Sequence, residues 1–341
     1  LEDCYWSALS VLLEAVRSGT TTLIDHHASP RAIRGSLEAV ARAFHATGLR
    51  GCLCYEVSDR DGAAAARAGL EENAAFIRTC RERHDPRIAA MFGLHASFTL
   101  SDETLTAAAT FGHDLGCGFH IHTAEDAVDQ EHTVRHYGQR VVERLHSQGI
   151  LGPGSIAAHG VHLSESEMEL LSATGTALVH NPQSNLNNAV GIADLTRLHE
   201  KGVLTGLGTD AMTTRMGAEV RTALWCQRLL HRDASAGLQA ASAALLRHNP
   251  RIAGKLFGLP LGEIAKGAPA DLILIDYNPP TPLTEENWLG HFVYGIAEAP
   301  VDTTIVAGRV LMENRQLRLD LDERKIQARA REQAEALWKR L

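Results

Sequence analysis

Short apolar runs alternate along the chain with longer stretches that have the periodicity of amphipathic helices. The apolar runs span residues 20–28, 50–57, 88–98, 118–124, 155–161, 177–182 and 204–211. Helical stretches lie between them, at residues 31–46, 63–82, 101–112, 129–147 and 164–174. Regular alternation of this kind is typical of right-handed βαβ units around a parallel sheet, and almost wholly apolar strands indicate a sheet covered on both faces.

The number of strands predicts an α/β fold of the TIM-barrel type with one strand missing. A closed (β/α)8 barrel needs eight strands, and seven are visible. The chain opens in a helical pattern from Glu2 to Arg17, so the first strand is expected before Leu1, which indicates a start within a longer polypeptide. Two more helical stretches follow the last strand, at 218–231 and 238–256. We therefore expect residues 1–260 to form strands two to eight of the barrel.

The composition changes after residue 260. Glycine and proline punctuate short apolar segments at 262–276 and 303–310, which is typical of a small β-sandwich or meander. The predicted domains are thus the barrel at 1–260, part of a β-sandwich at 261–318 and a charged closing helix at 319–341.

Charge and cysteine usage exclude several classes of protein. With a net charge of -8 and scattered basic residues, the chain lacks the electrostatic footprint of a nucleic-acid or anionic-membrane binder. No apolar run is long enough to span a membrane. None of the six cysteines forms a C-x-x-C pair, and a chain of this size needs no disulfide scaffold, so we expect a reducing, cytoplasmic setting. The partner expected from the hypotheses below is a small-molecule substrate.

Histidine is the composition's clearest signal. The chain holds 18 histidines, and a His or Asp stands at six of the seven predicted strand ends. In a parallel barrel those ends meet at one mouth, where reactive groups collect. A single strand-end histidine is more often a hydrogen-bonded core or rim residue, but six together favour an active site. These residues are His26 with His27, His95, His122, His159, His180 and Asp210.

The segment His120-Ile-His122-Thr-Ala-Glu125 is the sharpest local motif. His122 ends a strand and offers a neutral imidazole to a metal, while Glu125 can reach over the same mouth to move protons. His120 points to the same side but one layer deeper. For His120 a packed core role is favoured over a metal contact.

Two further strand ends carry polar groups. Asp210 ends the segment Gly206-Leu-Gly-Thr-Asp210, where it can ligate a divalent metal and accept a proton from water; the alternative is an N-cap for the next helix. His159 also ends a strand. Ser184 and Asn185 lie in a polar loop and either contact substrate or brace the loop, and the sequence leaves the two equal.

The motifs HIHTAED (120–126), AHGVHLS (158–164), VHNPQSN (179–185) and GLGTDA (206–211), in this order, resemble those of the amidohydrolase superfamily. Its guanine deaminase, cytosine deaminase and chlorohydrolase branch is more similar still. The SsnA aminohydrolases resemble the chain most, through IDHHASP (24–30), NNAVG (187–191), DYNPPTPL (276–283) and GRVLMENRQ (308–316). The resemblance covers essentially the whole chain.

The resemblance implies a role for each matching residue. His122 and Asp210 would be metal ligands, Asp210 also the general base, Glu125 the proton shuttle, and His159 the residue that faces water and substrate. One divalent metal is implied, zinc or alternatively iron. Family members also carry an H-x-H pair on the first strand, which would lie before Leu1 here. Adjacent His26 and His27 cannot replace it, so the isolated chain would be weak or inactive.

The resulting hypotheses differ in chemistry. The first is a metal-dependent hydrolase acting on non-peptide C–N bonds, by deamination of a small nitrogen heterocycle. The second is a chlorohydrolase-type displacement at the same site. The third is a barrel without metal or activity. We expect His26, His95, Ser184 and Asn185 to contact substrate, and the protein to form a homo-oligomer.

Overall fold

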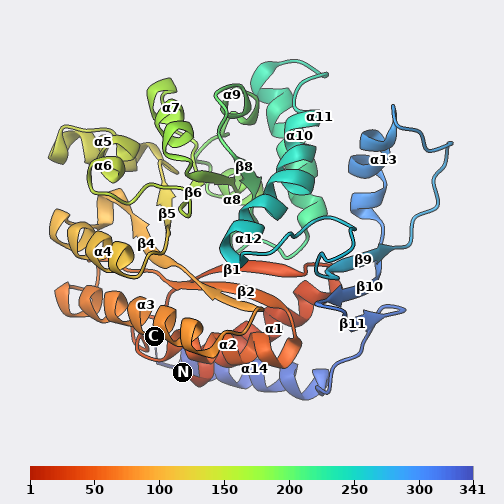
Figure 1. The fold of residues 1–341 in the computed structure, drawn as a ribbon, viewed down its shortest axis with the longest axis horizontal. Coiled ribbons are helices and arrows are strands. Elements are labelled where there is room, and N and C mark those ends of the chain that lie inside the picture. The colour runs from red at the N-terminus through yellow and green to blue at the C-terminus, as the bar shows by residue number, and fades with distance from the viewer. Residues whose placement is uncertain (341) are drawn as a thin grey trace.

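The computed structural model describes residues 1–340 and contains two parallel sheets whose strands follow one another in chain order (Figure 1). The smaller sheet has the order β1-β2-β3, and the larger has the order β4-β5-β6-β7-β8. A parallel bridge between Val57 and Leu94 connects the two. The strands are β1 (Thr22–His27), β2 (Arg50–Tyr55), β3 (Ile88–Ala90), β4 (Phe92–Ala96), β5 (Phe119–Thr123), β6 (Ile156–His159), β7 (Ala177–His180) and β8 (Thr205–Leu207). An α/β fold with parallel sheets is thereby confirmed.

Helices connect successive strands, as the alternation predicts. They are α1 (Glu2–Arg17), α2 (Ser36–Thr47), α3 (Ala63–Arg83), α4 (Asp102–Asp114), α5 (Ala127–Tyr137), α6 (Val141–Ser147), α7 (Glu165–Thr174), α8 (Pro182–Asn187), α9 (Leu195–Glu200), α10 (Met216–His231), α11 (Leu238–Ala243), α12 (Asn249–Phe257), α13 (Trp288–Tyr294) and α14 (Glu323–Trp338). Local chemistry sets their ends: Ser164 and Glu167 form a capping box at the start of α7, and Gly175 ends it with a φ of 68°.

Three predicted elements are divided in the structure. The apolar run 88–98 forms β3 and β4, which pair with β2 and β5 respectively. The helical stretch 129–147 is interrupted at Gly138, whose φ of 68° ends α5 before α6 begins. The stretch 238–256 contains a π-helical turn over Ala244–His248 between α11 and α12. The short helices α8, α9 and α13 have no counterpart among the expected elements.

The C-terminal segment adds an antiparallel sheet of order β12-β11-β10-β9. Its strands are β9 (Leu272–Ile275), β10 (Val301–Val306), β11 (Arg309–Glu313) and β12 (Gln316–Leu317). One hydrophobic cluster joins Val306 and Leu311 of this sheet to α1, α2 and β2. A buried ion pair between Arg50 and Asp271 ties the start of β2 to the segment before β9. The sheet is therefore packed on the α/β part of the chain.

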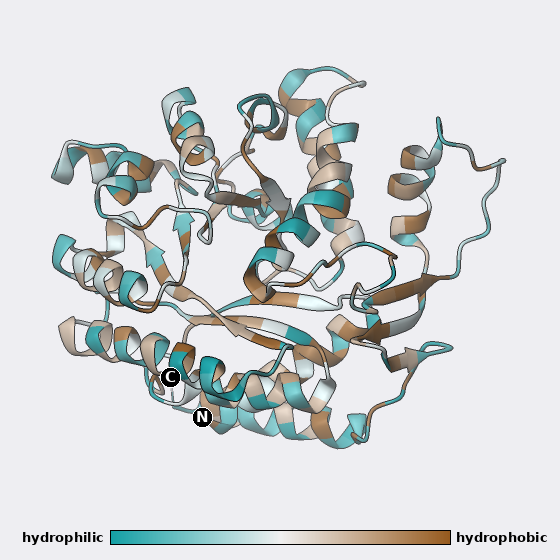
Figure 2. Ribbon diagram, viewed as in Figure 1, coloured by the Kyte–Doolittle hydropathy of each residue, from teal (hydrophilic) through white to brown (hydrophobic). Residues whose placement is uncertain are grey.

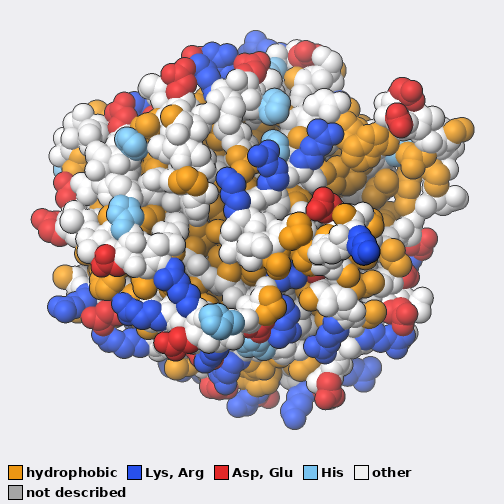
Figure 3. Space-filling model, in the orientation of Figure 1, with side chains coloured by type: hydrophobic (Ala, Val, Ile, Leu, Met, Phe, Trp, Pro, Cys, Tyr) orange, Lys and Arg blue, Asp and Glu red, His pale blue; other side chains and the backbone are white. Residues whose placement is uncertain are grey.

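The figures show how polarity is distributed. In Figure 2 the parallel strands combine brown and pale segments with teal at the ends of β4 and β5, while the helices show alternating brown and teal turns. On the face shown in Figure 3, acidic and basic side chains are interspersed, and apolar side chains gather between α10 and α13 at the upper right. Within residues 1–340, no helix is long and apolar enough to cross a membrane.

Candidate active site

Four histidines from different strands converge inside the parallel sheets. His26 comes from β1, His95 from β4, His122 from β5 and His159 from β6. The ring centroid of His122 lies 4.7 Å from that of His26, 5.3 Å from that of His95 and 5.5 Å from that of His159. The strand-end pattern in the sequence thus identified residues that the fold brings together around His122.

The backbone turns sharply at three of these strand ends. Ala124 after β5, His159 at the end of β6 and Asp210 after β8 have φ values of 49°, 73° and 48°. Residues other than glycine seldom adopt this left-handed region, and each such residue costs on the order of 1–3 kcal/mol where the conformation is strained. Strained residues of this kind are concentrated at functional sites.

His122 is oriented by a backbone carbonyl. Its Nδ1 lies 2.8 Å from the carbonyl oxygen of His95. A carbonyl oxygen only accepts, so Nδ1 carries the proton and Nε2 keeps a free lone pair. An imidazole fixed in this way by its other nitrogen is the usual form of a histidine that binds a metal.

His159 lies between an amide and a carboxylate. Its Nδ1 is 2.8 Å from Asn185 Oδ1, and its Nε2 is 3.6 Å from Glu125 Oε2. Donation from Nδ1 to the amide oxygen leaves Nε2 as an acceptor that faces the carboxylate. Burial lowers the pKa of His159, and the opposing charge of Glu125 offsets part of this effect. His159 and Glu125 can therefore share one proton.

Two hydrogen-bond donors hold the carboxylate of Asp210, one at each oxygen. Ser184 Oγ donates to Oδ2 at 2.6 Å, and the backbone N–H of Ala211 donates to Oδ1 at 2.8 Å. The N-cap of the next helix is Arg215, so Asp210 does not serve as that cap. The carboxylate retains lone pairs for a metal or a proton.

Asn188 connects the two acids and was missed by the sequence analysis. Its Nδ2 lies 3.2 Å from Glu125 Oε1 and 3.5 Å from Ser184 Oγ, the hydroxyl that holds Asp210. Asn188 follows α8, a helix too short to leave a periodic signal. Through it the side chains of Glu125, Ser184 and Asp210 border a common region.

A cavity of about 310 Å³ opens beside His122. His95 lies on its wall, with Nδ1 2.7 Å from the hydroxyl of Thr99, which itself donates to the carbonyl of Ala96. The hydroxyl proton is thus already used, so His95 Nδ1 is the donor and its Nε2 is free to accept. The other residues that line the cavity are Ala96, Phe98, Glu125, Asp126, Val128, Asp129, Asn188 and Val190.

Glu56, just beyond β2, is a second residue that was missed. Its Oε2 lies 3.8 Å from His26 Nε2, a buried atom without a hydrogen-bond partner in the described chain. His26, Glu56 and His122 offer ligand atoms that all lie within 4.8 Å of one another. An acid after an apolar strand is the signal that could have found it. His27 faces elsewhere and contacts Ser29.

Burial favours the neutral form of His26 and His95. It lowers the pKa of His95 to about 3, and that of His26 well below the usual value, with neighbouring histidines adding to the effect. Neutral imidazole is the form that binds metals. A free Nε2 on His122 and the nearby carboxylates therefore fit a divalent cation.

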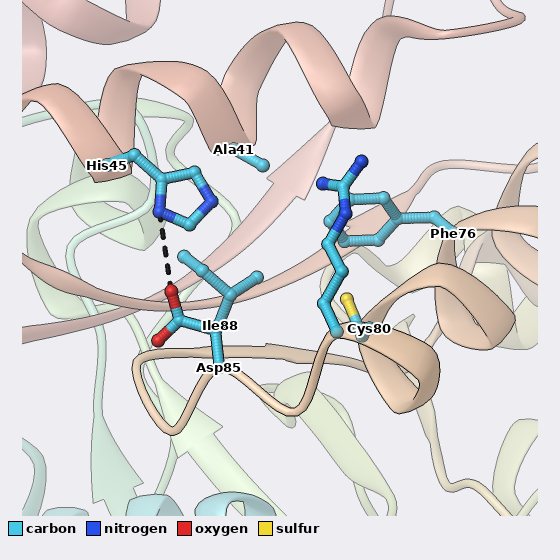
Figure 4. Close-up of a pocket in the computed structure, with 7 residues that line it drawn as sticks. Ala41, His45, Phe76, Cys80, Asp85 and Ile88 are labelled. Carbon is cyan, nitrogen blue, oxygen red and sulfur yellow. Dashed lines mark ion pairs between the residues drawn. The ribbon is translucent and has the colours of Figure 1, made fainter.

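Figure 4 shows a second hollow, which carries no such chemistry. It has a volume of about 10 Å³, enough for one water molecule at most. His45 forms an ion pair with Asp85 at its edge, at 3.4 Å. Ile88, at the start of β3, also lines it, whereas His95 and His122 lie toward the ends of their strands. The candidate active site therefore lies toward the other end of the strands from this hollow.

The chain belongs to the amidohydrolase family, whose model matches residues 1–311. A hydrolase that acts on C–N bonds, as the sequence analysis expected, is thereby confirmed. Relatives that are 33–36% identical over 98% of the chain are deaminases. This confirms hydrolytic deamination of a nitrogen heterocycle as the class of reaction.

Two curated relatives illustrate the similarity. The 5-methylthioadenosine/S-adenosylhomocysteine deaminase of Pelotomaculum thermopropionicum is 36% identical over 336 residues, which cover 98% of this chain and 75% of the relative. The 5'-deoxyadenosine deaminase of Methanosarcina acetivorans is 33% identical over 339 residues, which cover 98% of this chain and 76% of the relative.

Solved structures share the fold. An adenosine deaminase from Xanthomonas campestris with bound zinc has a TM-score of 0.85 at 24% identity, covering 98% of this chain and 75% of its own. An atrazine chlorohydrolase from Arthrobacter aurescens complexed with zinc has a TM-score of 0.83 at 18% identity, covering 97% of this chain and 77% of its own. At these identities the likeness concerns the fold alone.

Proposed function

We propose that the protein is a zinc-dependent deaminase that removes the exocyclic amino group of an adenine-type ring in a small nucleoside. The observation that carries the proposal is the connected set of side chains from His122 through His159, Glu125 and Asn188 to Ser184 and Asp210. The names of the relatives, which are deaminases of adenosine derivatives, supply the substrate class.

His122 and Asp210 are the residues that we propose as zinc ligands in this chain. Zinc, when bound, lowers the pKa of a water molecule from 15.7 to about 7 and so supplies a nucleophile at neutral pH. His26 and Glu56 border the same space and complete a donor-rich lining. Iron is the alternative metal.

The protein side chains then handle two protons. Asp210 accepts the proton of the attacking water, because its carboxylate is held in place by the donors Ser184 Oγ and the backbone N–H of Ala211. Glu125 delivers a proton to the ring nitrogen, Asp210 passes the proton it accepted to the leaving amino group, and the remaining hydroxyl proton of the attacked carbon returns to Glu125 as the oxo group forms. His159 Nε2 faces Glu125 as an acceptor, so the two side chains can hold this proton between them. The balance is water plus the aminated ring giving the oxo ring and ammonia.

The cavity beside His122 is proposed to hold the rest of the nucleoside. Phe98, Val128 and Val190 give it apolar walls for a ring or an alkyl substituent. The free Nε2 of His95 can accept a hydrogen bond from a hydroxyl or amino group. Asn185 and Ser184, which bond to His159 and Asp210, are proposed to act on substrate through those residues.

The fold that we propose for the intact site is a TIM-type barrel. The two parallel sheets would be neighbouring arcs of it, and β8 and β1 would flank the place of one more strand. The domain division at residues 260 and 318, the homo-oligomer and the cytoplasmic setting stay predictions.

The test is product analysis with the zinc-loaded full-length protein. 5'-Deoxyadenosine, 5'-methylthioadenosine and adenosine should each be assayed for ammonia and for the oxo product. A chlorinated triazine, assayed for chloride, tests the displacement alternative. We expect ammonia from at least one nucleoside in equal amount to the oxo product. Chloride release without ammonia would favour the chlorohydrolase reaction, and no release from any compound would favour the inactive barrel.

A further inference from the structure

A second group of donor atoms lies inside the sheets, next to the proposed active site. It consists of His26 on β1, Cys54 on β2 and His120 on β5. Cys54 Sγ lies 3.8 Å from His26 Nδ1 and 3.8 Å from His120 Nδ1. The two imidazole rings are nearly perpendicular, at 85°, with centroids 4.5 Å apart. One thiol and two imidazole nitrogens thus converge on one point.

These spacings are close to those of a zinc site. Zinc binds thiolate at about 2.3 Å and imidazole at about 2.0–2.1 Å, so tetrahedral geometry separates sulfur from nitrogen by about 3.6 Å. The two observed separations are 3.8 Å. The three ligand atoms all lie within 4.8 Å of one another. A shift of a few tenths of an ångström would bring them to coordinating distance.

Cys54 is the centre of the cluster. It is fully buried, and its S–H proton can be donated to the carbonyl oxygen of Asp25, at 3.4 Å. Without a metal, each imidazole meets the sulfur through Nδ1 as a donor or as an acceptor. With a metal on Nδ1, the proton of His26 would lie on Nε2, a buried atom that has no hydrogen-bond partner among the described residues and that lies 3.8 Å from Glu56 Oε2.

We propose that His26 Nδ1, Cys54 Sγ and His120 Nδ1 form a zinc site separate from the catalytic one. Binding forms a zinc–sulfur bond and two zinc–nitrogen bonds, and the thiol proton of Cys54 passes to solvent. Three protein ligands leave the fourth tetrahedral position to a water molecule or another small donor. Neither His122 nor Asp210 takes part, so this ion would be held without the proposed catalytic ligands, although His26 also borders the catalytic region.

The consequence is a cross-link between the two parallel sheets. β1 and β2 belong to the smaller sheet and β5 to the larger, and along their edges the sheets share the bridge between Val57 and Leu94. An ion held by all three strands would join the sheets from inside. It would also fix His26, whose other nitrogen faces Glu56.

Cobalt substitution separates this site from the catalytic one. The proposed catalytic ligands are nitrogen and oxygen, so a thiolate-to-cobalt charge-transfer band in the near ultraviolet reports on Cys54 alone. We expect Cys54→Ala to lose the band and one metal equivalent per chain. Cys52→Ala, which removes another buried cysteine of β2, should keep both, and Asp210→Asn should keep the band.

The unaltered protein provides a second test that does not depend on the folding of any variant. X-ray absorption at the zinc edge of the zinc-loaded protein should show a sulfur neighbour at about 2.3 Å. A spectrum with nitrogen and oxygen neighbours only, or a cobalt band that survives in Cys54→Ala, would overturn the proposal.

Discussion

The hydroxyl of Ser184 donates to Asp210 Oδ2 at 2.6 Å, which links α8 to the acid that follows β8. The bond uses one lone pair of the carboxylate and fixes the direction of the others. Without this bond, the carboxylate of Asp210 would keep the backbone N–H of Ala211 as its remaining donor, which holds only Oδ1. The relationship therefore makes Ser184 a positioning residue for Asp210.

Ser184→Ala should lower kcat with little change in KM. A hydrogen bond to a charged group is worth about 1.5–3 kcal/mol, which corresponds to about a ten- to hundredfold loss of rate. Steady-state kinetics of ammonia release measure it. Ser147→Ala, on an exposed position of α6, is the matched control and should be indistinguishable from the unaltered protein. An equal loss in both variants would contradict the role.

Glu125→Gln should abolish proton delivery while leaving substrate binding largely intact. General acid–base groups contribute about 10²- to 10⁴-fold to rate, so we expect a loss of kcat in that range. Glu131→Gln, an exposed residue on α5, changes the same charge away from the site and should keep full activity. Wild-type turnover by Glu125→Gln would remove Glu125 from the mechanism.

Histidine burial should make the fold acid-sensitive. Burial lowers the pKa of His180 to about 3, below the value of 6.5 in an unfolded chain. The unfolded state therefore binds more protons between those values, and stability falls as the pH falls from 6.5, by about 1.4 kcal/mol per pH unit for one such group.

Urea unfolding at pH 7, 6 and 5 isolates that contribution. The stability of His180→Asn should fall less steeply below pH 6 than that of the unaltered protein, by about 1.4 kcal/mol per pH unit. His146→Asn, exposed on α6, should keep the original slope. Parallel slopes for all three proteins would show that His180 titrates normally.

The buried ion pair between Arg50 and Asp271 should matter for stability. The guanidinium is bidentate, with distances of 3.0 and 3.2 Å, and both side chains are almost inaccessible, at 2% and 7%. Asp271→Ala leaves a buried charge unpaired, which costs about 3–5 kcal/mol of unfolding free energy. Asp276→Ala breaks an exposed pair with Arg315 and should cost less than about 1 kcal/mol. Chemical denaturation measures both free energies of unfolding, and a similar decrease for Asp271→Ala and Asp276→Ala would contradict this account.

Much of the fold was readable because parallel strands need apolar residues on both faces. The division of the run 88–98 was not, since apolar character continues through Met91 while the strand changes partners. Gly93 is a sequence feature that could have indicated where the run divides. A Cβ there would lie 2.3 Å from the carbonyl oxygen of Tyr55, so glycine permits the close approach of the strands at this position.

The site was only partly readable for a related reason. Strand-end residues such as His122 and His159 follow from topology, because parallel strands end at one mouth. Asn188 and Glu56 depend on side chains meeting across loops, which spacing along the chain does not encode. The sequence could not decide whether Ser184 and Asn185 contact substrate or brace the loop. In the structure, Ser184 bonds to Asp210 and Asn185 bonds to His159.

Turnover of 5'-deoxyadenosine by the zinc-loaded protein and by Asp210→Asn, with zinc measured on the same samples, tests the central claim most directly. The unaltered protein should release ammonia and retain zinc. The variant should lose at least about 10²-fold in kcat, the contribution of a positioned proton acceptor, and lose zinc from the catalytic site. Unchanged turnover and zinc content in Asp210→Asn would contradict the account.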